Sequence, residues 1–456
     1  MHKLKIENQN VLVAGLGTSG IAAVEVLMKL KANVTIYDKK TEKELADAID
    51  FLDLDKLQLS LGREPEDVSD FDLIVLSPGI PTDLPFLQEA RAKKVPIIGE
   101  LELAYRLSNG KFIAITGTNG KTTTTALVGE IFENAGKEAF VVGNIGIAAI
   151  SKALETSKDT VLITEVSSFQ LESIVDFRPK IAAILNITPD HLNRHKTMEN
   201  YILAKANIFK NQREQDFLIL NADNELTYRL SQNSKANVIF FSREKELDKG
   251  VFVVGENIVI KEYGKPYEIL CKTKDLKIPG KHNLENALAA IAIAFWAGIP
   301  KEMIIKTLKE FKGVEHRIEF VAEFEGVRFI NDSKGTNPDA TIRAIEAVQE
   351  PIVLIAGGMD KGNDFDELIR AFKGKVKHMV VLGEVAQRIK DTAEKNGFVH
   401  VTVVKKMDEA VEEAVKIAQK GDTVLLSPAC ASWDMYPNFE VRGRHFKECV
   451  EKIRRS

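Results

Sequence analysis

The sequence has 456 residues and a formal net charge of -4 at pH 7. A chain of this length exceeds what one hydrophobic core supports, and we expect three domains. The balanced charge offers no basic surface for nucleic acid, and no segment resembles a signal peptide or a transmembrane helix. We therefore expect a cytoplasmic protein that binds neither nucleic acid nor membrane. The cysteines, Cys271, Cys430 and Cys449, are widely spaced, which argues against a disulfide framework and a zinc cluster.

The N-terminal segment has the pattern of a βαβ unit. An apolar strand runs into the glycine-rich turn GLGTSG, a helix follows to about residue 31, and a second strand is predicted at 33–37. The turn has the GxGxxG spacing, and Asp38 lies where a dinucleotide-binding fold places its ribose-binding acid. Further strands are predicted at 71–76 and 95–98, so we expect the first domain to end near residue 99.

Residues 116–125, TGTNGKTTTT, form the most informative motif. They follow an apolar stretch and precede a helix that we predict to end at Gly136. A glycine-rich loop at the start of a helix lets backbone N–H groups and the helix dipole hold phosphates. Lys121 can reach the outer phosphates, and the Thr122 hydroxyl can bind Mg²⁺. The loop is a shortened GxxGKT form, and it predicts hydrolysis or transfer of a triphosphate.

The remainder of the chain alternates strands with helices, which predicts parallel sheets. In the second domain, strands are expected at 160–166, 180–187 and 216–221, a small antiparallel patch at 238–270, and helices from His282 to Phe311. In the third domain, strands are expected at 327–330, 352–356, 378–382, 400–404 and 423–426. The predicted architecture is three α/β domains, covering residues 1–99, 100–313 and 314–456.

Polar residues follow several strands of the second domain. Glu165 and His191 come after strand ends, at the edge where open α/β sheets bind ligands, and are candidate metal ligands. Asp190 is predicted to cap a helix, and His195 to lie on the surface. Lys205 stands in a helical segment among apolar residues, where a lysine would ordinarily extend to solvent.

Three polar clusters follow strands of the third domain. The segment FINDSKGTNPDAT holds the first, GGMDKGNDF holds Lys361, and SPACASWDMYPNFEVRG holds Ser432. Turn chemistry explains part of the first cluster but not Lys334. Together the clusters predict an anionic ligand. We expect Trp433 to pack rather than to line a pocket.

Taken together, these motifs resemble the Mur ligase family over essentially the full length of the chain. The matching segments, in family order, are GLGTSG, SPGI, TGTNGKTTTT, GNIG, EVSSFQLE, DHLNRH, AKANIF, PGKHNLENALAA, HRIE, NDSKGTNP, GGMDKGNDF and SPACASWDMYPNFEVRG. The resemblance is greatest to the members that add D-glutamate. It implies a monomeric ATP-dependent ligase of peptidoglycan synthesis, with a first domain for the UDP-sugar, a second for ATP, and a third for the amino acid and nucleotide.

The resemblance also implies substrates, cofactors and site residues. The implied substrates are ATP, D-glutamate and UDP-N-acetylmuramoyl-L-alanine, whose carboxylate would become an acyl phosphate. The implied catalytic residues are Lys121, Glu165, His191 and Lys205. The implied ligands of two Mg²⁺ ions are Thr122, Glu165, His191 and Lys205, the last carbamylated. The implied nucleotide-binding residues are Gly117, Thr118, Asn119, Gly120, Lys121, Thr122, Thr123, Asn286, Arg317, Asp332 and Lys334. The implied substrate-binding residues are Thr18, Ser19, Asp38 and Gly79 for the UDP-sugar, Thr336, Lys361, Ser432 and Phe439 for D-glutamate, and Asn144.

Other functions fit parts of the sequence. A dehydrogenase accounts for GLGTSG and Asp38 but not for the phosphate loop. A non-catalytic nucleotide-binding switch accounts for the loop but not for the polar clusters of the third domain. Folylpolyglutamate synthases share the second and third domains but generally lack the first, and other Mur ligases differ in their amino-acid pockets.

Overall fold

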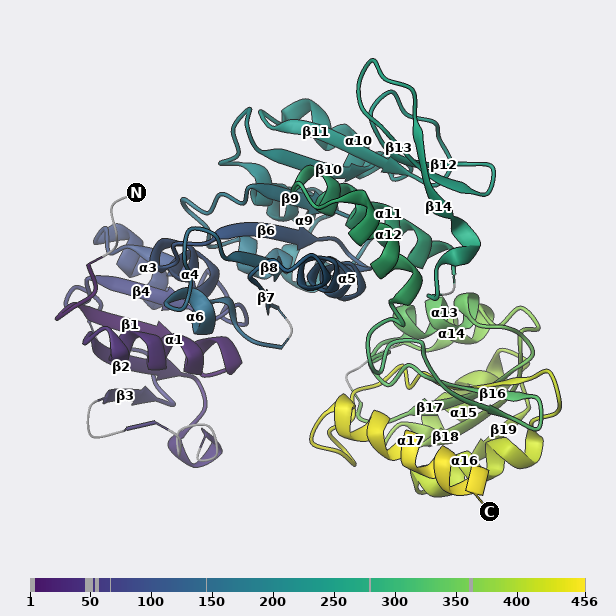
Figure 1. Ribbon diagram of the computed structural model, residues 1–456. Coiled ribbons are helices and arrows are strands. Elements are labelled where there is room, and N and C mark those ends of the chain that lie inside the picture. The colour runs from purple at the N-terminus through teal and green to yellow at the C-terminus, as the bar shows by residue number, and fades with distance from the viewer. Residues whose placement is uncertain are drawn as a thin grey trace. The chain divides into compact units, whose positions relative to one another are not determined.

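The chain folds into three β-sheets flanked by helices, distributed over two compact units (Figure 1). The computed structural model describes residues 5–45, 52–53, 57–65, 67–144, 146–278, 280–360 and 364–455. Unit 1 comprises Met1–Leu276 and Leu284–Glu310, and unit 2 comprises Lys277–Asn283 and Phe311–Ser456. The predicted α/β class is confirmed.

The first sheet of unit 1 is parallel, with strand order β3-β2-β1-β4-β5. Its strands are β1 (Asn10–Ala14), β2 (Asn33–Asp38), β3 (Leu57–Leu61), β4 (Leu73–Leu76) and β5 (Ile97–Gly99), with helices α1 (Thr18–Lys29) and α3 (Pro85–Ala92). In the turn after β1, a Cβ at Gly20 would lie 1.8 Å from the Gly15 carbonyl oxygen. Only glycine therefore lets α1 begin so close to the sheet.

The second sheet has the order β14-β13-β12-β11-β10-β9-β6-β8-β7. Its strands are β6 (Lys111–Thr116), β7 (Ala139–Gly143), β8 (Val161–Glu165), β9 (Ile181–Ile184), β10 (Phe217–Asn221), β11 (Asn237–Ser242), β12 (Gly250–Val254), β13 (Asn257–Lys261) and β14 (Glu268–Lys272). The antiparallel patch predicted at 238–270 is smaller than expected. β11 and β12 continue the parallel sheet, and only β13 and β14 are antiparallel to their neighbours.

Nine helices accompany this sheet in the described part of the chain. They are α4 (Glu100–Leu107), α5 (Lys121–Asn134), α6 (Ala149–Ala153), α7 (Ser168–Leu171), α8 (Leu192–His195), α9 (Met198–Ala206), α10 (Glu225–Leu230), α11 (Lys281–Trp296) and α12 (Lys301–Glu310).

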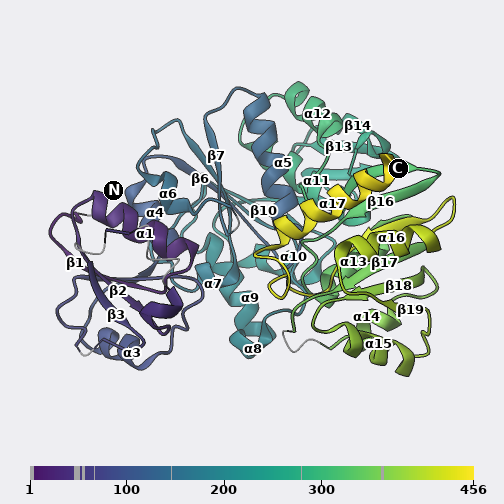
Figure 2. The same ribbon diagram turned by 90° about the horizontal axis from the view of Figure 1, so that it is seen from below.

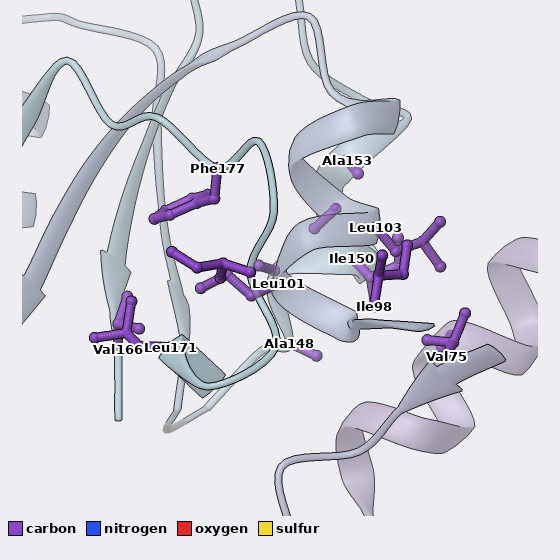
Figure 3. Packing of buried hydrophobic residues seen from close by; sticks show 14 of the residues in the cluster. Val75, Ile98, Leu101, Leu103, Ala148, Ile150, Ala153, Val166, Leu171 and Phe177 are labelled. Atoms are coloured by element: carbon purple, nitrogen blue, oxygen red, sulfur yellow. The ribbon is translucent and has the colours of Figure 1, made fainter. Parts of the chain in front are cut away.

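The two sheets of unit 1 share one hydrophobic core. α6 packs against α1 and α4 (Figure 2). The buried side chains of these helices belong to one cluster with side chains of both sheets. Figure 3 shows Leu101 of α4 and Ile150 of α6 in one cluster with Val75, on strand β4 of the first sheet, and Phe177, on the loop that leads into β9 of the second. Burial of apolar surface is the main stabilising term in folding. The shared core therefore explains why two sheets form one compact unit.

The sheet of unit 2 has the order β15-β16-β20-β17-β18-β19. Its strands are β15 (Glu319–Phe324), β16 (Val327–Asn331), β17 (Ile352–Gly357), β18 (Val376–Leu382), β19 (Val401–Val403) and β20 (Thr423–Leu426). Only β15, which we did not predict, is antiparallel to its neighbour.

Helices cover both faces of this sheet. They are α13 (Pro338–Ala347), α14 (Asp366–Arg370), α15 (Ala386–Lys395), α16 (Met407–Ile417) and α17 (Phe439–Arg455), and α17 was not predicted. In β17, Leu354 packs in one core cluster with residues of α13, α14 and α15, whereas the next residue, Ile355, packs in another with residues of α16 and α17. Strands buried on both faces read as continuous apolar runs, which is why the sequence predicts most of them.

Among the described residues, none of the helices combines the length and the apolar character that crossing a membrane requires.

Candidate active site

The phosphate loop connects β6 to α5 at the carboxyl edge of the second sheet. The Lys121 ammonium donates to the carbonyl oxygens of Gly117 (3.0 Å) and Thr118 (2.9 Å), which closes the loop on itself. Gly120 has φ of +82°, and a Cβ there would lie 2.1 Å from Asn286 Oδ1. Both facts require glycine, and the second places Asn286 of α11 against the loop.

The segment after β9 supports the loop through hydrogen bonds that we did not predict. Asn186 Oδ1 accepts from the Asn119 N–H at 2.9 Å, and the Asn186 amide donates to the Asn119 carbonyl at 3.1 Å. The Thr118 hydroxyl donates to the Thr188 carbonyl at 3.1 Å and accepts from the Thr188 N–H at 3.0 Å. Thr123 is buried behind the loop, whereas Thr122 is only partly buried. These bonds hold the loop in shape before any anion arrives.

Lys205 does not extend to solvent. Its side chain is 2% exposed, its Nζ donates to the Gly117 carbonyl at 2.9 Å, and it lies 4.6 Å from the centre of the Tyr201 ring. Burial, and secondarily the positive charge of Lys121, lower the pKa of Lys205 well below its usual value. This lysine, whose Nζ contacts the phosphate loop, therefore gives up its proton more readily than a lysine in water.

Glu165 is the last residue of β8, and His191 follows the end of β9, and these two strands flank β6 in the sheet. Glu165 is 3% exposed, and its Oε1 accepts from the Asn144 amide at 3.0 Å. His191 has a half-exposed side chain, and burial lowers its pKa. Asp190 does not cap α8: the N-cap residue is His191 itself, and Asp190 Oδ1 accepts from the His191 N–H. The prediction for Asp190 was therefore wrong.

The prediction that His195 lies on the surface was also wrong. Its ring is 6% exposed, its Nε2 lies 3.0 Å from Ser168 Oγ, and its Nδ1 lies 3.3 Å from Glu172 Oε1. The ring stacks on Phe169. Arg194 pairs with the same Glu172 carboxylate at 2.7 Å. His195 is thus part of a network that packs α8 against α7.

A cavity of about 750 Å³ opens on the first sheet. The four residues implied for the UDP-sugar, Thr18, Ser19, Asp38 and Gly79, line it, and so does Asn144, which was implied to bind a substrate. Asp38 accepts hydrogen bonds from the backbone N–H groups of Leu16 (2.9 Å) and Lys40 (3.0 Å). The carboxylate therefore fixes the glycine-rich turn at the wall of the cavity.

Gln170 also lines this cavity, and the sequence did not indicate it. It is 3% exposed, and its Oε1 accepts from the Ser167 N–H at 2.9 Å in the capping box of α7. Burial raises the pKa of the Glu100 carboxyl, and the Gln170 side chain lies close enough to that group to offset the rise in part. α7 begins soon after Glu165. The same short segment therefore carries Gln170, which lines the cavity on the first sheet, and Glu165, a candidate metal ligand on the second.

In unit 2, the segment after β16 brings several predicted residues together. Asp332 is 4% exposed, and its carboxylate accepts from the Ile318 N–H (3.2 Å) and the Ser427 hydroxyl (2.7 Å). Burial raises the pKa of Asp332 to about 6. The Lys334 ammonium lies 5.6 Å from the centre of the Phe439 ring.

Arg442 organises this region and was missed by the sequence analysis. It is 1% exposed and donates to Ser333 Oγ (3.0 Å) and to the carbonyls of Ser333 (2.8 Å), Cys430 (3.1 Å) and Ala431 (3.2 Å). Its spacing from Phe439 and Phe446 on one face of a helix is the signal that could have identified it as buried.

The other predicted residues of unit 2 have the following places. Arg317 is close enough to influence the pKa of Asp332, the Thr336 N–H donates to the Lys334 carbonyl, and Ser432 is buried. Trp433 is 62% exposed, so the prediction that it packs was wrong. Lys361 lies outside the described residues.

Comparisons with known proteins agree with this geometry. The family models that match are the Mur ligase MurD-like N-terminal domain (residues 9–99), the Mur ligase middle domain (115–294) and the Mur ligase glutamate ligase domain (316–430). Curated proteins called UDP-N-acetylmuramoylalanine–D-glutamate ligase are 57% identical in Alkaliphilus oremlandii over 455 residues and 51% identical in Clostridioides difficile over 453. Each match covers 99% of this chain and 100% of the relative.

Solved structures share the fold. The crystal structure of UDP-N-acetylmuramate–alanine ligase MurC from Thermotoga maritima gives a TM-score of 0.61 at 21% identity, covering 98% of this chain and 100% of that chain. A crystal structure of MurF from Acinetobacter baumannii gives 0.59 at 17% identity, covering 97% and 91%. With three family models in chain order and full-length relatives above half identity, this chain belongs to the Mur ligase family.

Proposed function

We propose that this Mur ligase uses ATP to join D-glutamate to the L-alanyl carboxylate of UDP-N-acetylmuramoyl-L-alanine. The substrates are those in the names of its full-length relatives. The observation that carries the proposal is the cavity on the first sheet, which continues to Asn144 and Gln170 beside Glu165. A ligand held there by its nucleotide and sugar extends its far end toward the phosphate loop.

The phosphate loop would supply the activation step. A bound triphosphate offers charged oxygens to Lys121 in place of the Gly117 and Thr118 carbonyls that it now contacts. The substrate carboxylate attacks the γ-phosphorus of ATP, ADP leaves, and an acyl phosphate forms. The amine of D-glutamate then attacks the acyl carbon and displaces phosphate. Positive charge from Lys121 stabilises the charge that develops on the transferred group.

The donor set fits Mg²⁺ only if Lys205 changes its charge. Glu165 provides hard carboxylate oxygen and His191 provides a ring nitrogen, but an ammonium at Lys205 would repel the cation. The neutral Lys205 amine can attack CO₂, release one proton and become a carbamate, whose single negative charge is shared by two oxygens. Its remaining N–H can still donate to the Gly117 carbonyl. Mg²⁺ bound by Thr122, Glu165, His191 and this carbamate would neutralise phosphate charge.

The residues of unit 2 provide a basic and polar environment for the amino acid and the nucleotide. Lys334 and Arg317 carry positive charge, and Ser432 and Thr336 carry hydroxyl groups. We assign Thr336, Lys361, Ser432 and Phe439 to D-glutamate, and Arg317, Asp332 and Lys334 to the nucleotide.

The test measures phosphate release with UDP-N-acetylmuramoyl-L-alanine and ATP while the amino acid is varied. D-Glutamate is expected to give turnover well above L-glutamate, L-lysine and L-alanine. Lys121→Ala should abolish it, and Lys137→Ala, at an exposed lysine just beyond the same helix, should not. Equal turnover with D-glutamate and L-lysine would refute the assignment of the amino acid. ATP turnover retained in Lys121→Ala would refute the role of the loop.

A further inference from the structure

Three potential metal ligands meet between α16 and α17 in unit 2, and none of them belongs to the proposed active site. Asp408, His445 and Cys449 place their ligand atoms within 4.8 Å of one another. Asp408 Oδ1 lies 2.8 Å from Cys449 Sγ and 3.2 Å from His445 Nε2.

The positions of these residues in the fold explain why they meet. His445 and Cys449 are four residues apart on α17, so they lie on one face of the helix. Asp408 is in the first turn of α16, which packs against α17. The wide spacing of the cysteines argues against a cluster built from cysteine alone, whereas the fold gives Cys449 partners of two other types.

The histidine is held in an orientation that suits a metal ligand. His445 Nδ1 lies 2.8 Å from the Tyr436 hydroxyl, which leaves Nε2 facing Asp408. A histidine that binds a metal nearly always has its other ring nitrogen held by a hydrogen bond in this way. Cys449 is 6% exposed, whereas Asp408 is exposed and His445 is partly exposed, so a hydrated ion can approach from one side.

Simple hydrogen bonding explains part of the arrangement. An acid in the first turn of a helix is stabilised by the helix dipole, and Asp408 Oδ1 accepts from the Cys449 thiol. Burial and this bond raise the pKa of Cys449 to about 12, so the thiol keeps its proton when no ion is bound. The approach of His445 Nε2 to the same oxygen, at 3.2 Å, is also an ordinary histidine–aspartate contact. What distinguishes the cluster is that three types of metal ligand converge while Tyr436 holds the other ring nitrogen of His445.

A second cluster in unit 2 serves as a contrast. Glu315, His316 and Glu319 also lie within ligand range of one another. There the Lys447 ammonium already donates to both carboxylates, at 2.6 and 2.9 Å. The Lys447 ammonium therefore already neutralises these two carboxylates, and the cluster is explained without a metal ion.

We propose that Asp408, His445 and Cys449 form a zinc site, with water as the fourth ligand. On binding, the Cys449 thiol releases its proton to solvent, the thiolate sulfur bonds to Zn²⁺, and no electron is transferred. Thiolate and imidazole select zinc over magnesium, so the Mg²⁺ of the ligase reaction does not compete. The ion links α16 to α17 and stabilises unit 2. This site is independent of the proposed ligase activity.

The test titrates Co²⁺ into the full-length protein after treatment with a chelator. We expect one equivalent to produce a thiolate-to-cobalt charge-transfer band and the intense visible bands of tetrahedral cobalt, both removed by Zn²⁺ but not by Mg²⁺. Cys449→Ser should abolish the charge-transfer band, and His445→Gln should weaken binding strongly. The matched controls Cys271→Ser and Cys430→Ser should retain it. Tyr436→Phe should weaken binding about tenfold or more by freeing the ring of His445.

Two results would overturn the proposal. One is the absence of a charge-transfer band at saturating Co²⁺ in the wild type, and the other is a band that persists in Cys449→Ser. Zn²⁺ should also raise the thermal unfolding temperature of the wild type but not of Asp408→Asn. This pair keeps the test decisive if Cys449→Ser fails to fold, because an equal shift in both proteins contradicts the site.

Discussion

Lys205 is the residue whose chemistry depends most on burial. Its pKa is lowered because the ammonium is removed from water and lies near Lys121, and the neutral amine is the form that reacts with CO₂. We predict that Lys205→Ala reduces ligase turnover by about 10²- to 10³-fold, the loss typical of removing one charge-stabilising group. Lys210→Ala, at an exposed lysine in the next turn, should leave turnover unchanged.

The carbamate itself can be observed directly. With ¹³C-labelled bicarbonate, the wild type should show a carbamate carbon signal in the NMR spectrum that Lys205→Ala lacks and Lys210→Ala keeps. A wild type with full activity and no such signal after removal of CO₂ would show that the lysine acts unmodified.

Arg442 is a positioning residue, because it contacts the loops that carry Lys334 and Ser432 and not the proposed substrates. Lysine at this position cannot reach all the acceptors that the guanidinium serves. A hydrogen bond to a charged group contributes about 1.5–3 kcal/mol, so Arg442→Lys should lower the free energy of unfolding of unit 2 by about that much. It should also raise the KM for D-glutamate more than it lowers kcat. Arg444→Lys, at an exposed neighbour on α17, is the matched control, and equal denaturation midpoints in the two variants would contradict the role of Arg442.

At this scale, the sequence predicts residues whose role depends on local spacing. Gly120 and Lys121 are recognisable because the loop and helix that use them are contiguous in the chain. Gln170 and His195 are not, because each lies beside residues that the fold brings from other segments. The helical spacing of Arg442 indicates burial, but its acceptors on Ser333, Cys430 and Ala431 come from other segments. His195 is buried by Phe169 and Glu172, on another helix, and no pattern around the histidine records them.

Among the elements, α4 carries a buried carboxyl group where the two sheets of unit 1 meet. Glu100, its first residue, is 2% exposed, and its Oε1 accepts from the Ile150 N–H at 2.8 Å. Burial raises the pKa of Glu100 from 4.5 to about 7. Below pH 4.5 the group is protonated in both the folded and the unfolded chain and contributes nothing. As pH rises to 7, the unfolded chain ionises first, so the free energy of unfolding falls, and above pH 7 the loss is complete.

The shift corresponds to about 3 kcal/mol. Glu100→Gln keeps the acceptor for Ile150 without the ionisation, so it should be more stable than the wild type at pH 8 and lose that advantage by pH 4. Denaturant unfolding at several pH values measures the difference. Glu25→Gln, at an exposed position on α1, should show no such dependence, and a Glu100→Gln difference that is constant with pH would contradict the raised pKa.

Several of the elements that were not predicted share a physical reason. β3, β7 and β15 are edge strands with mixed exposure, and α17 carries charged residues along most of its length. Half-exposed elements lack the continuous apolar runs that identify β1, β17 and β20. Helices cover both faces of each sheet, so the central strands are apolar along their whole length, and the sequence predicts them for this reason.

At the scale of the whole molecule, the sequence indicates α/β sheets in series but not which of them share a core. Whether two sheets share a core depends on whether helices such as α4 and α6 bury their side chains against one sheet or against both. The structure shows that they contact both sheets of unit 1, so these sheets should lose their structure together. Unit 2 has its own core on both faces of its sheet.

We therefore predict two thermal transitions in calorimetry, one for each unit. UDP-N-acetylmuramoyl-L-alanine should raise only the transition of unit 1, because the cavity that it is proposed to occupy is lined by residues of that unit alone, and a ligand stabilises the state that binds it. Arg442→Lys should lower only the transition of unit 2, and Glu100→Gln should move only that of unit 1. Each of the two substituted residues lies inside one core, and the ligand is proposed to bind one unit. A single transition that the ligand and both substitutions shift equally would show that the two units unfold as one. The independence inferred from their separate cores would then be wrong.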